Sequence, residues 1–468
     1  MDSENSKQNR MATEPIPKLM FKIGVPIVLS MMLQAVYNIV DSAYLSNMDE
    51  AGEEALTALG LAFPIQLLII AMSIGTGVGV NALMSRSLGQ GKKDKASRAA
   101  GNGIFMAIVI TICFMLFAFF GVRAYVNSQN SSGAISEIVI EMTVDYLQIC
   151  CGWSFGIVFF SVFEKMLQST GRSVFSTVAQ VTGAVINIAL DPILIYGWLG
   201  APEMGVKGAA YATIIGQIAS FIVALGFYLK YNVDIDKSPK YILPKASILK
   251  EIYVIGLPAI ISQALLTVMT YGLNIILGQI PDVGENAVTV YGLYCKIQQL
   301  IIFAAVGMRD TITPVVSFNY GARSKKRTKD AIKYGLIYTA VLMFIGLLII
   351  EIFAEQLTTF FSLSDQTFDM CVDCMRIISI GFPIAGLCVA FQGIFQAVEC
   401  GIESLIISLG RQVVFVLPVA WAISQFITGI ENVYLIWYTF FIAEVLTMIC
   451  TLIMYRRKKV RKKVNIED

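Results

Sequence analysis

Ile23-Gly24-Val25-Pro26 and Ile255-Gly256-Leu257-Pro258 are two copies of one motif, 232 residues apart. The same offset aligns some eighty residues without a gap, and close to a third of those positions are identical. The other matches are Ser30 with Ser262, Gly52-Glu53 with Gly284-Glu285, Gly60-Leu61 with Gly292-Leu293, Ile65-Gln66 with Ile297-Gln298, Gly75 with Gly307, Ser85 with Ser317 and Gly89 with Gly321. Apolar bias alone rarely aligns Gly, Pro, Ser, Glu and Gln together. The chain is therefore an internal duplication, which weakens later in each half, where Gln168 pairs with Gln396 at a slightly smaller offset.

The composition indicates a membrane protein. Of 468 residues, 56% are apolar and 15% are charged, and the mean hydropathy is +0.70. A soluble chain averages about 25% charged residues. A dozen spans of about 20 residues each would leave short loops and no room for a soluble domain. A membrane-tethered enzyme or a receptor with a large ectodomain is thereby excluded, and continuous apolar runs disfavour a β-barrel.

Twelve apolar segments are long enough to cross a bilayer. They are residues 21–45, 57–84, 101–124, 146–166, 174–198, 208–230, 252–279, 287–312, 332–353, 375–397, 405–427 and 433–455. We therefore expect an all-α polytopic membrane protein with 12 transmembrane helices.

The basic residues predict which side of the membrane each loop occupies. If the N-terminus is cytoplasmic, the cytoplasmic segments carry 29 of the 35 Lys and Arg residues. The outside loops hold three, which are Arg123, Lys207 and Arg376. Cytoplasmic loops are enriched in Lys and Arg, so both termini are expected inside.

Each copy of the repeat contains six helices, so the two halves enter the membrane with the same orientation. The sequence thus predicts an N-terminal lobe at 1–230, a polar cytoplasmic linker at 231–251, and a C-terminal lobe with a basic tail at 252–468. Two pseudo-symmetric six-helix lobes related by an axis along the membrane normal suit a transporter that works by alternating access. Channels and membrane enzymes can also arise by duplication.

Two groups of polar residues lie in the outer half of the first lobe. Asp41 shares a helix face with Asn38 and Tyr37, and Asp191 shares one with Asn187. Pro192 removes a backbone donor, so we expect a kink and a freed carbonyl there. Buried charges are costly, which makes such residues functional candidates. Their oxygens suit Na⁺, or a proton held by carboxylates in a buried site; the alternative is two buried acids satisfied by neighbouring amides.

Six further charges are predicted within the membrane. Lys296 and Glu444 lie at mid-membrane, where they are a candidate ion pair. Arg309 and Asp310 are adjacent and should point about 100° apart, near the cytoplasmic end of the eighth segment, where Arg can snorkel. Arg411 and Glu164 lie one or two turns from that face, and are candidates for gate or interface residues.

No catalytic residues are predicted. The chain has no histidine, so Gly152-Trp153-Ser154-Phe155-Gly156, which fits a nucleophile-elbow pattern, cannot complete a triad. We expect this motif to lie inside a membrane helix. Its glycines, like Gly75 and Gly79, fit close helix packing instead. We expect no enzyme activity, no cofactor and no metal beyond Na⁺.

Several motifs together resemble the multidrug and toxic compound extrusion (MATE) family, specifically its DinF-like bacterial branch. They are Thr13-Glu14-Pro15-Ile16, Gly24-Val25-Pro26, Tyr37-Asn38-Ile39-Val40-Asp41, Asn187-Ile188-Ala189-Leu190-Asp191-Pro192, Gly205-Val206-Lys207-Gly208-Ala209-Ala210 and Ser317-Phe318-Asn319-Tyr320-Gly321-Ala322. The resemblance covers nearly the whole chain.

The resemblance implies a V-shaped fold of two six-helix lobes that exports cationic or amphiphilic organic compounds against an inward flow of Na⁺ or H⁺. Matched by motif, the cation site comprises Asp41, Asn187 and Asp191, with Thr213 as a fourth member. Another branch uses acids on the seventh and tenth helices. Here the segment 252–279 has none beyond Glu251 at its edge, and 375–397 has none before Glu399, which disfavours that mechanism.

The expected partners are small organic substrates and membrane lipids, and not nucleic acid. The expected protein is a monomer in a bacterial plasma membrane. Two alternatives stay open, a flippase for lipid-linked precursors and a passive channel. The flippase class lines its cavity with basic residues, for which Lys296 and Arg309 are the candidates here.

Overall fold

The computed structural model describes residues 10–46, 52–129, 136–281, 283–359, 365–427, 429–457 and 463. Across these ranges the chain is helical and contains no strand. Ten helices are long and apolar enough to cross a membrane, and two bent helix pairs bring the number to 12 if each pair is one span. The predicted fold class is confirmed, because each of the twelve predicted segments coincides with one of these spans.

The fourth and tenth spans are broken rather than continuous. The fourth consists of α6 (Glu137–Gly152) and α7 (Phe155–Ser169), which bend by 45°. The motif at 152–156 therefore lies at a break and not inside one helix, which corrects the expectation. The reason is local, since Trp153 leaves helical geometry and closes α6 with hydrogen bonds from its N–H to Cys151 and Ile149. The tenth consists of α13 (Asp365–Ser379) and α14 (Phe382–Ala397), bent by 50°.

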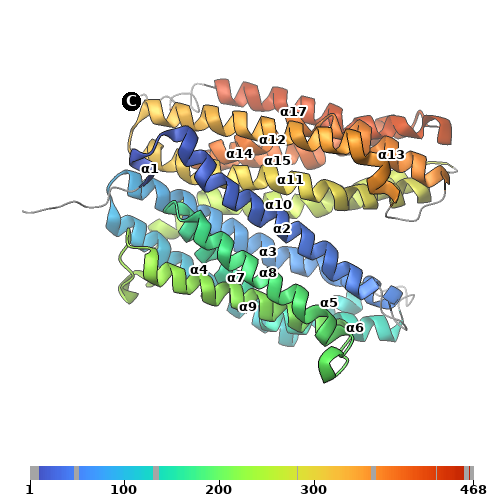
Figure 1. Cartoon of the computed structure of the whole chain (residues 1–468), viewed down its shortest axis with the longest axis horizontal. Helices are drawn as coiled ribbons and strands as arrows, with labels where there is room; N and C mark the ends of the chain where they lie inside the picture. Colours follow the sequence, from blue (N-terminus) through green and yellow to red (C-terminus); the bar gives the residue numbers. More distant parts are fainter. Residues whose placement is uncertain are drawn as a thin grey trace, which may run out of the picture. The chain divides into compact units, whose positions relative to one another are not determined.

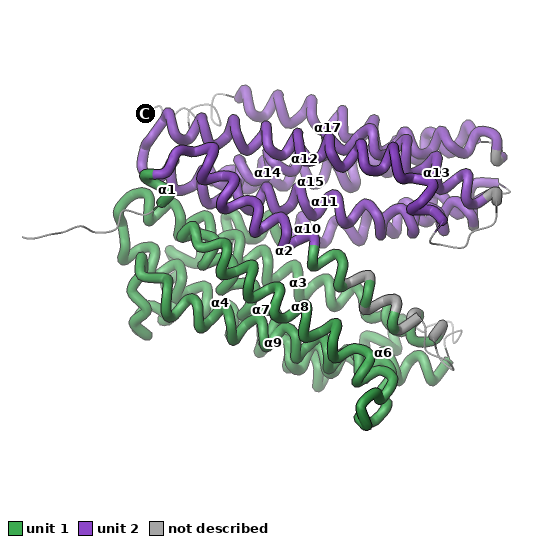
Figure 2. Tube along the Cα trace, in the orientation of Figure 1, with its two compact units in different colours: residues 1–13, 33–260 green, residues 14–32, 261–468 purple. Residues whose placement is uncertain are grey.

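The described residues form two compact units, residues 1–13 with 33–260 and residues 14–32 with 261–468 (Figure 2). In unit 1, α8 (Ser173–Ile195) packs most extensively on α9 (Val206–Tyr231), and α7 packs on α3 (Gly52–Gly89). The remaining elements lying wholly in this unit are α1 (Arg10–Thr13), α4 (Lys93–Phe120), α5 (Val122–Gln129), η1 (Trp198–Gly200) and η2 (Pro239–Tyr241), as labelled in part in Figure 1.

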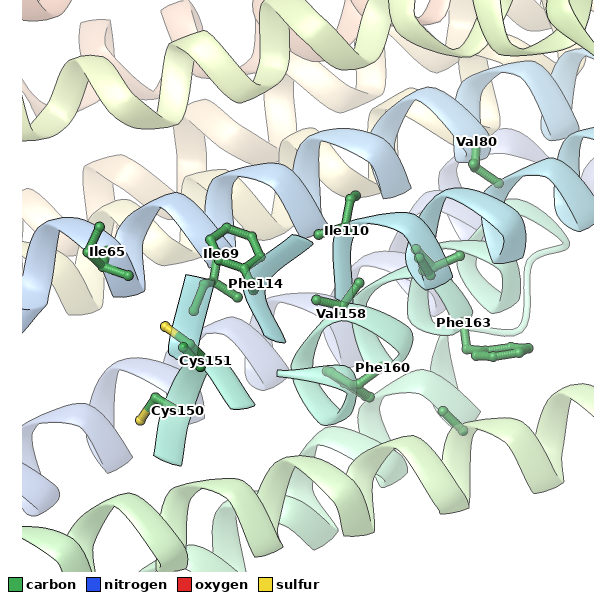
Figure 3. Close-up of a cluster of buried hydrophobic side chains, with 14 of the residues drawn as sticks. Ile65, Ile69, Val80, Ile110, Phe114, Cys150, Cys151, Val158, Phe160 and Phe163 are labelled. Carbon is green, nitrogen blue, oxygen red and sulfur yellow. The ribbon is translucent and has the colours of Figure 1, made fainter. Parts of the chain in front are cut away.

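Apolar side chains from α3, α4, α6 and α7 meet in the core of unit 1 (Figure 3). Ile69, Ile110, Phe114 and Val158 are all less than a tenth exposed there. Cys150 and Cys151 lie in the same core, and neither forms a disulfide with another described cysteine. The packing of these side chains holds α3 and α7 against each other.

Unit 2 is built around α11 (Gly284–Gly321), which packs on α12 (Lys325–Thr359) and α14. The eleventh span of the chain, also in unit 2, consists of α15 (Gly401–Leu409), the π-helical turn η3 (Gly410–Val414) and α16 (Val416–Ser424). Its last span is the 3₁₀ segment η4 (Ile430–Trp437) followed by α17 (Tyr438–Arg456).

Two long helices have residues in both units. Residues 16–32 of α2 (Ile16–Ser46) belong to unit 2 and its remainder to unit 1, whereas residues 246–260 of α10 (Ala246–Gly278) belong to unit 1 and its remainder to unit 2 (Figure 2). The first helix of each repeat therefore begins among the helices of the other repeat.

Glycines allow both of these helices to pack closely. In unit 1, a Cβ on Gly75 of α3 would lie 2.8 Å from the backbone nitrogen of Ile260, and one on Gly79 would lie 2.3 Å from the Ile252 carbonyl oxygen. In unit 2, a Cβ on Gly307 of α11 would lie 2.8 Å from Cα of Val28. Gly75 matches Gly307 and Ile260 matches Val28 at the repeat offset, so both crossings use equivalent residues. The packing role predicted for Gly75 and Gly79 is confirmed.

The polar segment after α9 is fixed to unit 1. The buried side chain of Asn102 donates to the Tyr241 carbonyl at 3.1 Å and accepts from the Lys245 N–H at 2.8 Å. The Tyr241 hydroxyl donates to Asp94, and this hydrogen bond raises the pKa of Tyr241. Glu251 then pairs with Arg86 at 2.9 Å and with Lys95 at 2.6 Å. These hydrogen bonds and ion pairs therefore hold the polar segment after α9 against the helices of unit 1.

Candidate functional site

A buried carboxylate–carboxamide pair lies on α8. Asp191 is 0% exposed and Asn187 is 3% exposed. They are one helical turn apart, and Asn187 Nδ2 donates to Asp191 Oδ1 at 3.2 Å. Asn187 Oδ1 is buried and has no hydrogen-bond partner within the described ranges. The two neighbours are thus brought together as the sequence predicts, with an acceptor oxygen left over.

The helix continues beyond Pro192 to Ile195. A proline inside a helix leaves the carbonyl four residues earlier without its usual donor, here that of Ile188. This freed carbonyl belongs to the turn between Asn187 and Asp191. Backbone and side chains therefore both contribute oxygen atoms at this level of α8.

Helix α9 approaches this part of α8 closely enough to exclude other side chains. A Cβ added to Gly216 of α9 would lie 3.0 Å from Cβ of Asn187. A Cβ on Gly183 would lie 2.5 Å from the Gly216 carbonyl oxygen. Thr213 is half-buried and lies one turn before Gly216 on α9. Gly216, and not Thr213, is the residue of α9 that faces Asn187, and no hydrogen bond joins Thr213 to the pair in the described part of the chain.

The other predicted group, around Asp41, lies on the second half of α2. Residues 37–41 are helical, and Tyr37 is half-buried, but the side chains of Asn38 and Asp41 lie outside the described part of the structure. One contact ties the end of α2 to the end of α8. The Tyr196 hydroxyl donates to the Tyr44 carbonyl, and the two rings meet edge to face with centroids 6.2 Å apart. The helical turns that contain residues 41 and 191 therefore each come about one turn before this contact between Tyr44 and Tyr196 in unit 1.

Glu444 pairs with a residue other than the one predicted. It accepts from Arg411 through both carboxylate oxygens, with Nε–O distances of 3.0 and 2.9 Å. The side chains are 13% and 14% exposed. Arg411 lies in the π-helical turn η3, a type of distortion that is often found at functional sites. Lys296 is exposed on α11 and has no ion pair in the described part of the chain. The sequence could not predict which cation faces α17, because the π turn shifts the phase of the helix.

Arg309 and Asp310 also differ from expectation. Arg309 Nη2 lies 3.0 Å from Asp310 Oδ1, so the neighbours form an ion pair instead of diverging. The side chains are 11% and 5% exposed, which rules out snorkelling by Arg309. The flexible Arg309 stem folds along α11 against Gly393 of α14, whose missing side chain leaves room for it.

Glu164 is part of a buried cluster, and its role as a gate or interface residue stays a prediction. Its Oε1 accepts from Gln168 Nε2 at 2.9 Å, and its Oε2 lies 3.6 Å from Lys165 Nζ. Lys165 in turn donates to Gln168 Oε1 at 3.1 Å. Lys165 is only 2% exposed, although it is one of the 29 basic residues that the sequence assigns to cytoplasmic segments.

Two acids of the tenth span were missed. Asp369 and Asp373 precede the predicted segment 375–397, but they belong to α13, which begins at Asp365. The amphipathic pattern of α13 was the signal that could have revealed them, since its polar residues repeat at helical spacing. Both acids are exposed and lie at the end of the span predicted to face outside.

Known proteins are similar to this chain over most of its length. The model of the MatE family matches residues 26–193 and 258–422, one match in each half of the chain. The chain is 23% identical over 415 residues to the multidrug export protein MepA of Staphylococcus haemolyticus, covering 88% of each chain. It is 24% identical over 438 residues to a FAD transporter of Shewanella oneidensis, covering 91% of this chain and 92% of that one.

Solved structures share the fold. An outward-facing multidrug resistance MATE family transporter of the MOP superfamily superimposes with a TM-score of 0.89 at 24% identity, over 98% of this chain and 99% of that one. A MOP superfamily transporter from Pyrococcus furiosus, described as having a binding pocket of reverse polarity, gives a TM-score of 0.87 at the same identity and coverage.

Proposed function

The chain belongs to the MatE family, whose members are transporters and not enzymes, and from this premise we propose that it is an antiporter whose coupling cation binds at Asp41, Asn187 and Asp191. It is a multi-pass protein of the plasma membrane. Its relatives named as multidrug exporters support an amphiphilic organic cation as cargo.

The observation that carries the proposal is the buried pair on α8. Asp191 is fully buried, and the nearby Asn187 Oδ1 lacks a donor within the described ranges. A buried carboxylate is costly unless it is paired, protonated or bound to a cation. Carboxylate, carboxamide and carbonyl oxygens are ligands that a hard cation accepts. A proton on Asp191 would serve the same purpose, because it removes the charge.

The proposed cycle follows from that requirement. In the state open to the outside, the site takes up Na⁺ or H⁺, which lowers its affinity for a cationic cargo. The loaded transporter then returns the cation to the cytoplasm. Each elementary charge moved down the membrane potential contributes about 2.3 kcal/mol per 100 mV. Cation and cargo must stabilise different states, since a ligand with equal affinity for both shifts nothing.

The test uses purified protein in vesicles with a Na⁺ gradient and a pH gradient imposed separately. We expect Asp41→Asn and Asp191→Asn each to slow gradient-driven efflux of a fluorescent organic cation by about tenfold or more. Glu137→Gln is the matched control, because Glu137 is an exposed acid in the first turn of α6. Wild-type efflux in either Asn variant would show that the assignment is wrong.

Asn187→Leu separates the two coupling ions. It keeps the size of the side chain and removes its oxygen. Na⁺-driven transport should be lost because the ion loses a ligand, whereas H⁺-driven transport should persist because a proton on Asp191 needs no carboxamide ligand. Efflux that needs no gradient would support a passive channel instead.

Support for a lipid-linked precursor flippase is limited to Lys296. Arg309 and Arg411 are each paired with a carboxylate, so neither offers an uncompensated charge to an anionic headgroup. The assay should also measure transport of FAD, an anionic compound, since one relative is named as a FAD transporter. If FAD is carried and Lys296→Gln abolishes that transport, the cargo is anionic.

A further inference from the structure

Helix α11 is the central helix of unit 2, and one strip of its surface is uncovered. In the most apolar stretch of α11, 72% of the residues are buried, against 22% in that of α12. The exposed residues in the described part of α11 are Thr289, Gly292 and Lys296. They are three and four residues apart, so they share one face of the helix. A Cβ added to Gly292 would meet no atom within 4 Å, so this strip borders open space.

The composition of the strip argues that it does not face lipid. The exposed side chains of α12 include Ile337, Val341 and Phe344, as expected for a helix that contacts acyl chains. The strip on α11 has no large apolar side chain and contains a lysine. Lys296 comes twelve residues after Gly284, the first residue of α11, so it lies about 18 Å along the helix. A cation at that depth is costly in lipid, so such residues face the protein interior or a water-filled space.

The face of α11 that bears Lys296 is also the face that meets α2. Gly307 comes eleven residues after Lys296, which is about three helical turns, so the two residues lie on the same face. A Cβ on Gly307 would lie 2.8 Å from Cα of Val28 in α2. Thus α2 covers this face at Gly307, whereas Lys296 is exposed. In transporters built from internal repeats, substrates bind near the bilayer midplane on the faces that the repeats turn to each other. This makes Lys296 a candidate for contact with the cargo.

Lys296 carries a charge that no described residue neutralises. It has no hydrogen bond and no ion pair in the described part of the chain. Arg309 and Arg411, the other cations of unit 2 that were predicted within the membrane, are each paired with a carboxylate. The equivalent of Lys296 in the first repeat is Pro64, so the symmetry of the repeats does not require a lysine here. An anionic group on a ligand would supply the missing partner.

We propose that Lys296 binds a carboxylate of the cargo, so that the preferred cargo is an amphiphilic zwitterion and not a simple cation. This rests on the proposed function, because it names the cargo of the same antiporter more closely. The lysine ammonium has three N–H donors, and hydrogen bonds between ionised groups are the strong ones. The same charge repels a cargo that is only positive. Lys296 therefore determines specificity, while the coupling cation binds in unit 1.

Equilibrium binding of two matched dyes to the full chain in phosphatidylcholine nanodiscs tests the proposal. Rhodamine 110 is a zwitterion with a free carboxylate, and rhodamine 123 is its methyl ester, a cation of nearly the same shape. Fluorescence polarisation should show that the wild type binds rhodamine 110 about tenfold more tightly than rhodamine 123. Binding at equilibrium needs no gradient, so it measures recognition of the cargo separately from coupling.

Substitutions of Lys296 separate its charge from any structural role. Lys296→Gln should weaken binding of rhodamine 110 about tenfold and strengthen that of rhodamine 123 slightly, because the like charge is gone. Lys296→Glu should reverse the preference and Lys296→Arg should keep it, which is a pattern that misfolding would not produce. Lys329→Gln is the matched control, since Lys329 is an exposed lysine near the cytoplasmic end of α12, and it should leave the preference unchanged.

Four outcomes would overturn the proposal. Three are equal affinity of the wild type for both dyes, no binding of rhodamine 110, and a preference that survives in Lys296→Gln. In the fourth, phosphatidylglycerol added to the nanodiscs removes the difference between the wild type and Lys296→Gln, which would show that the lysine binds a lipid phosphate and not the cargo. Asp191→Asn keeps the result distinct from the antiport test, because that variant should lose gradient-driven transport while keeping the preference for rhodamine 110.

Discussion

Four residues with positive φ end helices at equivalent turns of the two repeats. Gly91 and Gly171 have φ of 71° and 77° in unit 1, and Arg323 and Glu399 have φ of 53° and 58° in unit 2. Gly91 and Arg323 are equivalent at the offset of 232 residues. Glycine adopts this conformation without steric cost, whereas other residues lose about 1–2 kcal/mol. The second repeat therefore keeps the turn geometry without the residue that favours it.

Gly91→Ala should lower the free energy of unfolding by about 1 kcal/mol, because alanine is strained at φ of 71°. No atom lies within 4 Å of the added Cβ, so the effect isolates the backbone. Thermal unfolding in detergent measures it. Gly226→Ala is the control, since Gly226 lies inside α9 with equally open space, and it should be neutral or slightly stabilising. Equal effects of the two changes would contradict this account.

At the scale of elements, close helix crossings hold the first helix of each repeat. The crossing of α3 and α10 depends on Gly75 and Gly79, and that of α11 and α2 on Gly307. Helices in a membrane gain little from the hydrophobic effect between them, so close contact of small residues is their main attraction. These glycines are therefore needed for packing, and not for backbone conformation.

Gly75→Ala should destabilise unit 1 by about 1–3 kcal/mol, because its Cβ would lie 2.3 Å from Ile260 Cγ1 and 2.8 Å from the Ile260 backbone nitrogen. Gly60→Ala lies in the same helix α3 and meets no atom within 4 Å, so it should have no such cost. Comparing the unfolding midpoints of the two variants tests the crossing. If both variants unfold at the wild-type midpoint, the helices do not pack as described.

At the scale of the whole molecule, each repeat buries one basic side chain where two of its helices cross over a glycine. The crossings are equivalent in the two repeats, but the basic residue comes from the other helix of the pair in the second repeat. In unit 1, Lys165 of α7 lies over Gly77 of α3, and a Cβ on Gly77 would lie 2.8 Å from Lys165 Cγ. In unit 2, Arg309 of α11 lies over Gly393 of α14, and a Cβ on Gly393 would lie 3.0 Å from Arg309 Cγ. Gly77 is equivalent to Arg309, and Lys165 to Gly393 at the smaller offset. The basic residue and glycine have been exchanged between the repeats.

This exchange predicts a rescue. Lys165→Gly removes the cation beside Glu164, and Gly77→Arg forces a second stem onto that of Lys165, so each single change should destabilise the protein. The double variant has the arrangement of unit 2 and should regain about 1–2 kcal/mol relative to the sum of the single effects. Gly60→Arg combined with Lys165→Gly is the control and should show no coupling, because Gly60 is open. Additive effects in both pairs would show that the two crossings are not interchangeable.

The family resemblance, the twelve spans and the pair Asn187–Asp191 were all predictable from the sequence. The spans follow from apolar length, because backbone groups in lipid must form helices. Asn187 and Asp191 lie one turn apart in any helix, so local spacing brings them together. The roles of Asp41 and Thr213 stay predictions.

Which distant side chains meet depends on the three-dimensional packing of the helices. It pairs Glu444 with Arg411 rather than Lys296, because the π turn of η3 directs Arg411 towards α17. It also joins Asp369 and Asp373 to Glu431 around one cavity, across a separation of about sixty residues. Hydropathy and residue spacing predict where a residue lies along the axis of its own helix. Which helix faces another depends on breaks, bulges and glycine crossings, whose geometric effects accumulate over many turns and are not readable from any short stretch of sequence.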